Sequence, residues 1–182
     1  MPTETLVPDG TSGINQWSYS GGSSFADSVD DSSTSEYIYE TLMNHYVYLT
    51  ITNPSVAEAD IDFDEDVTVT PKIYAHHTGT GSRDLEVDIT GAPGSGIVIA
   101  SDTIAIANDS SYPLYSGTSH TEMSSGTDWT YAGLEDMLLY LKLKDRIARF
   151  QYLRVSYAYL ELTYTEAVTG VVNNAILFGS NF

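Results

Sequence analysis

Turn residues divide this chain into short segments, and this constrains its fold more than any other feature of the sequence. The chain has 14 Gly and 6 Pro, with Ser, Thr, Asn and Asp gathered around them. The segments between are rich in Tyr, Val, Ile and Thr, which suit a pleated, half-buried strand. Eight strands are expected: Gly13–Tyr19, Tyr37–Leu42, His45–Thr52, Val67–His76, Leu85–Thr90, Ile97–Ile106, Met137–Lys144 and Leu153–Thr165. This spacing predicts an all-β protein, an antiparallel sandwich or barrel.

The segment around residues 134–144 fits two periodicities. Leu134, Met137, Leu138 and Leu141 recur at the spacing of an amphipathic helix. Leucines also alternate with polar residues from position 139 onward, which is typical of a strand. We expect a tight turn at Ala132–Asp136 followed by a strand.

The most regular alternation lies in Arg154–Tyr164. One face is expected to carry Arg154, Ser156, Ala158, Leu160, Leu162 and Tyr164, and the other Val155, Tyr157, Tyr159, Glu161 and Thr163. Neither face is polar throughout, so we expect a central strand that is covered on both sides.

Three regions are expected along the chain. Residues 1–12 are polar, contain two prolines and predict an N-terminal arm that packs no core. Residues 13–165 form the sandwich domain, and residues 166–182 form an apolar C-terminal tail. Such a tail docks either onto its own subunit or onto a neighbour.

Charge excludes several classes of partner. The chain has 7 Lys+Arg against 25 Asp+Glu, a net charge of −18. Such a surface repels phosphate backbones and anionic lipid, so we expect no nucleic-acid and no membrane partner. Acid excess with scarce lysine is typical of proteins from salt-saturated cytoplasm, where the Debye length falls to about 3 Å. An ordinary acidic protein and a calcium-loaded one are the alternatives.

No pattern in the sequence indicates catalysis. The absence of cysteine excludes disulfides, thiolate zinc sites and cysteine nucleophiles. The chain has no Gly-x-Ser-x-Gly elbow and no glycine-rich phosphate loop. Its first residues lack the basic and apolar regions of a secretory signal, and no apolar run has the length of a membrane span. We expect a protein that is not an enzyme and has no catalytic residues.

The main acidic cluster contains Asp60, Asp62, Asp64 and Asp66. Carboxylates at this spacing could supply oxygen ligands to calcium, although the glycine and glutamate of an EF-hand loop are missing. A solvated acidic edge explains the same residues. We favour the edge, keep calcium as the alternative and expect no other cofactor.

Aromatic residues near turns raise the possibility of glycan binding. Trp17, Trp129 and Tyr131 lie in or beside predicted turns, where exposed rings could stack on sugars. The alternative is that these rings close the ends of the sandwich core.

Two stretches resemble a known group of proteins. The first is Leu6-Val-Pro-Asp-Gly-Thr-Ser-Gly-Ile-Asn-Gln-Trp17, followed by Phe25-Ala-Asp-Ser-Val-Asp-Asp31 and Tyr37. The second is Trp129-Thr-Tyr-Ala-Gly-Leu134, a strand, and then Leu153-Arg-Val-Ser-Tyr-Ala-Tyr-Leu-Glu-Leu-Thr-Tyr164. This order resembles jelly-roll-like β-sandwich proteins of tailed viruses, found as head decoration, turret, tail or fibre modules. The acidic stretch and the apolar tail depart from that pattern.

The resemblance and the acid excess together imply a non-enzymatic virion structural protein of a haloarchaeal virus, assembled in the host cytoplasm. It would contact other virion proteins and copies of itself. The expected contact residues are Leu6, Val7, Val171, Val172, Ile176, Leu177, Phe178 and Phe182. The alternative is a carbohydrate-binding module or receptor-binding fibre domain that uses exposed aromatics.

Overall fold

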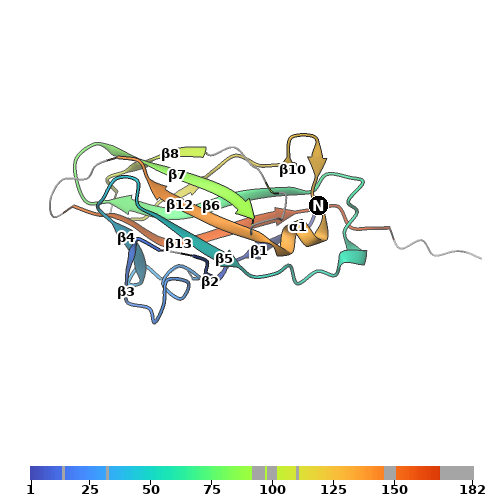
Figure 1. The fold of residues 1–182 in the computed structure, drawn as a ribbon, viewed down its shortest axis with the longest axis horizontal. Helices are drawn as coiled ribbons and strands as arrows, with labels where there is room; N and C mark the ends of the chain where they lie inside the picture. The colour runs from blue at the N-terminus through green and yellow to red at the C-terminus, as the bar shows by residue number, and fades with distance from the viewer. Residues whose placement is uncertain are drawn as a thin grey trace, which may run out of the picture.

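The computed structural model describes residues 1–13, 15–31, 33–91, 97, 102–109, 111–145 and 151–168. In these residues regular structure is almost entirely β (Figure 1). The strands are β1 (Thr3–Leu6), β2 (Pro8–Thr11), β3 (Ser18–Ser20), β4 (Tyr37–Glu40), β5 (Tyr46–Ile51), β6 (Thr68–His77), β7 (Ser82–Gly91), β8 (Asp102–Ala107), β9 (Leu114–Ser116), β10 (Glu122–Ser124), β11 (Thr127–Asp128), β12 (Met137–Leu143) and β13 (Leu153–Thr163). The helices are the 3₁₀ turn η1 (Glu58–Asp60) and the short α1 (Tyr131–Glu135).

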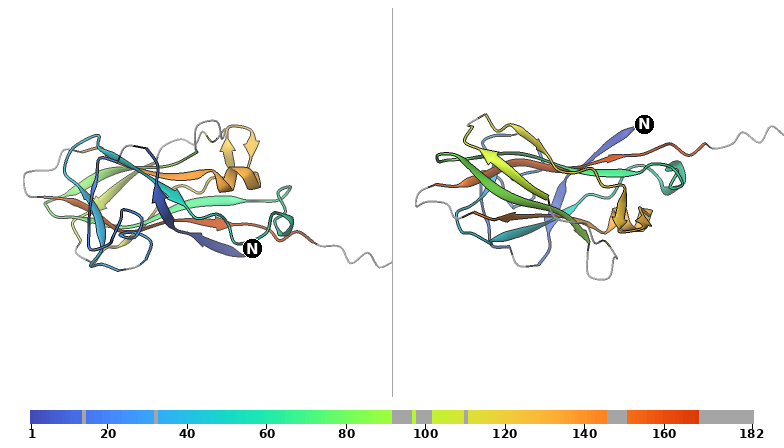
Figure 2. Two further views of the ribbon diagram at one scale, coloured as in Figure 1. Left: turned by 60° about the horizontal axis from the view of Figure 1, so that its bottom comes forward. Right: turned by 90° about the horizontal axis from the view of Figure 1, so that it is seen from above.

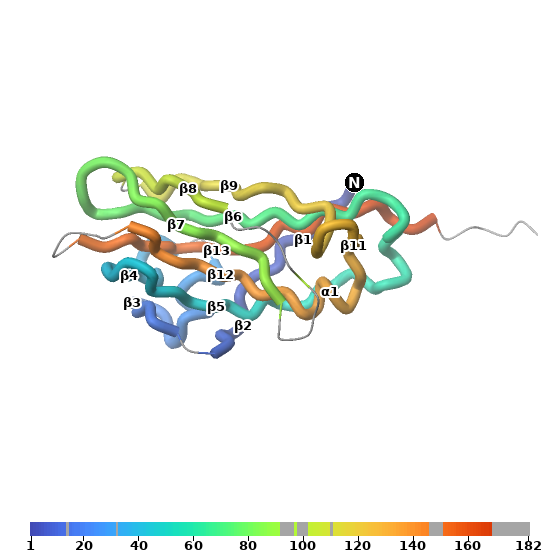
Figure 3. Tube along the Cα trace, turned by 45° about the horizontal axis from the view of Figure 1, so that its top comes forward, coloured from blue at the N-terminus to red at the C-terminus, as the bar shows by residue number. Residues whose placement is uncertain are grey.

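Two antiparallel sheets form the body of the protein. Sheet A has the order β3-β4-β13-β6-β9, and β1 pairs with the C-terminal part of β13. Sheet B has the order β2-β5-β12-β7-β8. The right-hand view of Figure 2 shows the two sheets as facing layers. The small hairpin of β10 and β11 lies with α1 at one end of the sandwich (Figure 3).

Eight of the strands are connected as a jelly roll. Along the chain, β4, β6, β9 and β13 lie in sheet A, whereas β5, β7, β8 and β12 lie in sheet B. The sheet orders are β4-β13-β6-β9 and β5-β12-β7-β8. Of the eight strands, the first in the chain, β4, lies beside the last, β13, and the second, β5, lies beside the seventh, β12. This is the jelly-roll arrangement. The predicted antiparallel sandwich of jelly-roll type is therefore confirmed. The described residues form thirteen strands rather than about eight.

Alternation along the strands builds the core between the sheets. Every second residue of β5 and β12 points inward, and these side chains are fully or almost fully buried. They are Val47, Leu49, Ile51, Met137, Leu139, Leu141 and Leu143. The even-numbered residues of β13 from Ala158 onward face them from sheet A. Burial of this apolar surface is the main force that holds the layers together.

Two expected strands differ from the observed ones. Only the last part of the segment Gly13–Tyr19 is in a strand, since β3 begins at Ser18. In the segment Ile97–Ile106, β8 begins at Asp102, and most of the residues before it lie outside the described part. The expected turn before β12 is confirmed as α1, where the Thr130 hydroxyl accepts a hydrogen bond from Gly133 N–H at 3.1 Å.

The prediction that residues 1–12 form an arm without core contacts is wrong. β1 pairs with β13 and β2 pairs with β5, so this segment adds a strand to each sheet. The side chain of Leu6 is only 1% exposed and belongs to the core. Val7 exchanges hydrogen bonds with Thr52. Polar residues form strands here because backbone pairing needs no apolar sequence. Leu6 was predicted to contact a neighbouring subunit, but its burial in the core makes it unavailable for that contact.

Most of the predicted C-terminal tail lies outside the described residues. The described chain ends at residue 168, and the predicted contact residues Val171, Val172, Ile176, Leu177, Phe178 and Phe182 lie outside it. Among the described residues, no helix has the length and apolar character needed to cross a membrane.

Candidate functional site

A β-bulge in the long strand β13 changes which residues face outward. Val155 pairs with Ala75 of β6, but the next pair is Tyr157 with Tyr74. Ser156 is therefore an extra residue in β13. A bulge of this kind bends the strand and reorients the side chains before it.

The bulge places Arg154 on the outer face of sheet A. Val155 is completely buried in the core, so Arg154 lies on the opposite side, together with Tyr157 and Tyr159. The expectation from strict alternation, which grouped Arg154 with Ala158, is wrong for this reason. Alternation holds again from Tyr157 onward.

Tyrosine rings surround the guanidinium of Arg154. Arg154 is paired with Tyr39 of β4 in the sheet register. Its guanidinium carbon lies 4.6 Å from the ring centroid of Tyr37 and 5.8 Å from that of Tyr152. Both distances are in the range of cation–π contacts. The rings of Tyr37 and Tyr39 also meet edge to face, with centroids 5.9 Å apart.

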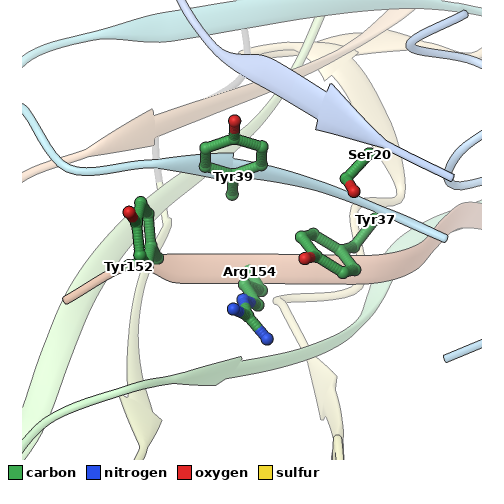
Figure 4. A pocket seen from close by; sticks show the side chains of 5 residues that line it. All are labelled: Ser20, Tyr37, Tyr39, Tyr152 and Arg154. Atoms are coloured by element: carbon green, nitrogen blue, oxygen red, sulfur yellow. The ribbon is translucent and has the colours of Figure 1, made fainter. Parts of the chain in front are cut away.

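These side chains line a surface pocket of about 200 Å³, here called the Arg154 pocket. Its lining residues are Ser20, Tyr37, Tyr39, Tyr152 and Arg154. The three tyrosines and Ser20 form an arc around Arg154 (Figure 4). The pocket thus combines one cation, four hydroxyl groups and three aromatic rings, two of which contact the cation.

Arg154 has no acidic partner among the described residues. All 25 Asp and Glu lie in the described residues, and none comes within 4 Å of its guanidinium to form an ion pair. In contrast, Lys72, Lys142 and Lys144 each pair with a glutamate. The Nε atom of Arg154 is buried and has no hydrogen-bond partner among the described residues. No acidic side chain therefore neutralises the guanidinium, which can pair with an anion in addition to its hydrogen bond with Tyr112.

His76 and Tyr112 lie beside Arg154 on the β6 side. His76 pairs with Arg154 in the register, is 6% exposed and has a ring centroid 4.2 Å from that of Tyr112. Burial lowers the pKa of His76, and the positive charge of Arg154 lowers it further. Burial raises the pKa of Tyr112, although a hydrogen bond with Arg154 opposes this. Near neutral pH, Arg154 is therefore the cation of this region and His76 is uncharged.

A second feature is a cluster of tyrosines farther along the same face, here called the sheet A tyrosine patch. It consists of Tyr74, Tyr157 and Tyr159. Ring centroids are 5.7 Å apart for Tyr74 and Tyr157 and 4.8 Å apart for Tyr157 and Tyr159. All three side chains are half-buried. An ion pair between Lys72 and Glu161, at 3.3 Å, lies on the same two strands.

The outer face of sheet B carries a matching cluster, here called the sheet B tyrosine patch. It consists of Tyr46, Tyr48 and Tyr140, with ring centroids 4.8 to 5.8 Å apart. Burial and the nearby negative charge of Glu86 raise the pKa of Tyr140. Lys142, the next outward residue of β12, pairs with Glu86 at 3.4 Å. Tyr48 and Tyr140 also line a hollow of about 230 Å³.

The tryptophans proposed for glycan stacking are core residues, which corrects that prediction. Trp17 is 4% exposed and Trp129 is 2% exposed. Their indole N–H groups donate hydrogen bonds to the carbonyl oxygens of His45 and His120, both at 3.0 Å. Tyr131 is half-buried, and its hydroxyl donates to the Val56 carbonyl at 3.1 Å. The alternative interpretation, that these rings close the core, is the one the structure favours.

The four aspartates of the acidic stretch do not converge. Asp60 lines a hollow near Glu166, whereas Asp64 and Asp66 line a different one. The backbone N–H of Asp64 donates to Asp62 Oδ1 at 3.1 Å, so part of this stretch caps its own turn. Within the described part of the chain, no group of three or more acidic or histidine side chains has the arrangement of a metal site. This geometry favours the solvated edge.

The Arg154 pocket and the tyrosine patches were not singled out from the sequence. A signal was present, because Tyr37-Ile-Tyr39, Tyr46-Val-Tyr48 and Tyr157-Ala-Tyr159 all place tyrosine at the two-residue period of a strand. Chemically, the pocket suits binding of an anion through Arg154, and the patches suit contact with another surface. No protein-family model matches the sequence, and no curated protein is significantly similar to it.

Proposed function

We propose that this protein is a non-enzymatic structural subunit that works by burying its two tyrosine patches against neighbouring subunits. The observation that carries the proposal is the presence of a three-ring cluster on each outer face of the sandwich. In a chain of charge −18, both clusters place uncharged tyrosine at outward-facing strand positions.

Tyrosine is suited to such contacts for a physical reason. Its ring contributes a large apolar area, its hydroxyl remains hydrated or hydrogen-bonded, and it loses little conformational entropy on ordering. Protein interfaces are accordingly enriched in tyrosine and depleted in lysine and acidic residues at their centres. Each patch is made of tyrosines with an ion pair beside it, and Glu86 and Asp88 lie next to the sheet B patch.

The two patches lie on different sheets, which bears on the type of assembly. If one patch binds the other on the next copy, the contact is heterologous and repeats head to tail, giving a ring or an extended array. If each patch binds the same patch on another copy, both contacts are isologous, and sheet A contacts alternate with sheet B contacts along the assembly. Either mode builds more than a dimer, as a shell or tail component requires.

We further propose that the assembly is a virion, with the chain as a head decoration, turret or tail component that assembles in the host cytoplasm. The jelly roll is common among viral capsid domains, and lectin domains share it, so the fold supports this assignment by analogy. The acidic surface supports a host with a salt-rich cytoplasm.

Paired substitutions in the two patches test the proposed association. The variant Tyr157→Ser with Tyr159→Ser removes two rings from the sheet A patch, and Tyr46→Ser with Tyr140→Ser does the same in sheet B. Each is expected to lower the association constant at least tenfold in molar salt, measured by sedimentation. Tyr19→Ser is the matched control, because Tyr19 is 44% exposed and belongs to neither patch. Unchanged association in both paired variants would refute this function.

The apolar tail offers a separate contribution to assembly. Deleting residues 171–182 is expected to weaken association without unfolding the sandwich, whose described core lies within residues 1–168. A truncated chain that associates as the full chain does would remove the tail from the proposal and leave the patches.

A further inference from the structure

We infer that the Arg154 pocket binds a sugar that carries a carboxylate, such as a hexuronic acid or a sialic acid. This site is separate from the two tyrosine patches, and none of its residues was among the aromatics first considered for glycan binding. A guanidinium without an acidic partner among the described residues lies in a tyrosine-lined cavity of about 200 Å³.

The guanidinium determines the charge of the ligand. Arg154 is half-buried and lines the pocket, and no carboxylate of the described residues is within ion-pair distance of its guanidinium. A planar guanidinium matches a carboxylate with two parallel hydrogen bonds. The rings of Tyr37 and Tyr152 restrict the guanidinium by cation–π contact, so little freedom remains to be lost on binding.

The rest of the pocket determines the kind of carboxylate. Because the rings of Tyr37 and Tyr152 hold the guanidinium, the ring of Tyr39 is left to pack against the apolar face of a pyranose. Their hydroxyls, with that of Ser20, supply donors and acceptors for the hydroxyls of a sugar. An acidic peptide side chain would use the guanidinium but leave most of these groups without a partner.

The bulge connects the pocket to the fold. Ser156 is the additional residue of β13, and it turns Arg154 from the core side to the outer side. His76 and Tyr112 then support Arg154 from the neighbouring strand and loop. Bulges are frequent beside binding sites because they reorient one side chain in this way.

The net charge predicts how binding responds to salt. A surface of charge −18 repels an anionic sugar at long range in dilute buffer. Molar salt screens that repulsion, whereas the guanidinium contact at short range and partial burial is screened less. We therefore expect binding to be no weaker in 1 M salt than in dilute buffer.

Calorimetric titration with trigalacturonate and with N-acetylneuraminate in molar potassium chloride tests the inference. The matched controls are the methyl ester of trigalacturonate, which keeps the ring and loses the charge, and the peptide Gly-Glu-Gly, which keeps the charge and loses the ring. At least one acidic sugar is expected to bind, with both controls at least tenfold weaker.

Variants test whether the binding measured by calorimetry takes place in the Arg154 pocket. Arg154→Gln and Arg154→Lys are expected to weaken binding at least tenfold, since lysine keeps the charge and loses the planar fork. Tyr37→Ser should also weaken it. Arg83 lies outside the pocket and donates a hydrogen bond to the Ser82 carbonyl. The control variant Arg83→Gln should therefore bind the acidic sugar as tightly as the original chain does. A melting curve for each variant confirms that it is folded.

Three results would overturn the inference. They are the absence of binding to either acidic sugar, equal binding of the methyl ester, and equal or tighter binding of Gly-Glu-Gly, which would assign the pocket to protein carboxylates. Unchanged binding by a folded Arg154→Gln variant would overturn it as well. None of these results depends on the state of association, so this inference and the proposed function can fail independently.

Discussion

Arg154 and Tyr157 lie on the same face of β13 although three positions separate them. In a regular strand, residues an odd number of positions apart face opposite sides. The bulge at Ser156 removes this rule at one point, with Val155 opposite Ala75 and Tyr157 opposite Tyr74. The only cation of the Arg154 pocket therefore depends on one additional residue.

Deleting Ser156 tests that dependence. A regular β13 would turn Arg154 toward the core, where an unpaired charge costs about 3 kcal/mol or more. We expect the deletion to lower the free energy of unfolding by at least that amount in denaturant titration. Ser156→Ala keeps the bulge and should cost less than about 1.5 kcal/mol. Equal stability of the deletion variant and the original chain would contradict this role of the bulge.

Burial of the tryptophans makes a second prediction. Trp17→Ala and Trp129→Ala each remove a core ring and are expected to cost about 3–5 kcal/mol in free energy of unfolding. In the original chain, tryptophan emission should be shifted to the blue and insensitive to sugars. A sugar-dependent change in emission that either Trp variant abolishes would restore the glycan platform first considered for these residues.

Ionic strength should change stability strongly. With 25 acidic and 7 basic residues, self-repulsion opposes the compact state in dilute buffer. Molar potassium chloride is expected to raise Tm by about 6 °C or more, which corresponds to about 2–3 kcal/mol for a domain of this size. A variant with Asp64→Asn, Glu65→Gln and Asp66→Asn, all at exposed positions, should respond less. A melting temperature that does not change with salt would contradict the salt-adapted interpretation.

Calcium provides a related prediction for the acidic stretch. Because Asp60 lies apart from Asp64 and Asp66, calcium should raise Tm no more than sodium at matched ionic strength. A calcium-specific rise that Asp62→Asn and Asp64→Asn abolish would show a site that forms only with the metal bound.

Histidine burial predicts the direction of the pH dependence. Burial lowers the pKa values of His76 and His120 in the folded state, so the unfolded chain takes up protons first as pH falls. Stability should be complete above the ordinary histidine pKa of about 6.5 and decline as pH falls below it. The measurement belongs in molar salt, where loss of negative charge has least effect.

The variants His76→Gln and His120→Gln identify the groups responsible. Each should flatten the fall in unfolding free energy between about pH 6.5 and pH 5, and the double variant should flatten it most. A slope that persists unchanged in the double variant would assign the pH dependence to other groups.

The sequence predicts the sandwich well and the site poorly, for physical reasons. Strands such as β5 and β12 carry strict alternation of buried residues, and that pattern is local. β1 was missed because its pairing uses the backbone and only Leu6 enters the core. The bulge was missed because Ser156 and its neighbours fit a regular strand equally well in sequence.

The Arg154 pocket depends on the pairing register of β3, β4 and β13. Its residues come from β3, from β4 and from the beginning of β13, and only the pairing of these strands brings them together. The tyrosines at a two-residue period were visible in the sequence. Their outward direction became clear only once the neighbouring apolar residues were placed in the core.

Sedimentation equilibrium of the unmodified chain in molar potassium chloride tests the central claim most directly. Over a concentration series from about 1 to 100 µM, a range relevant to micromolar affinity, the mass is expected to rise from the 19.9 kDa of one chain to more than twice that value. A mass of 19.9 kDa at every concentration would contradict the assignment of the tyrosine patches as subunit contacts.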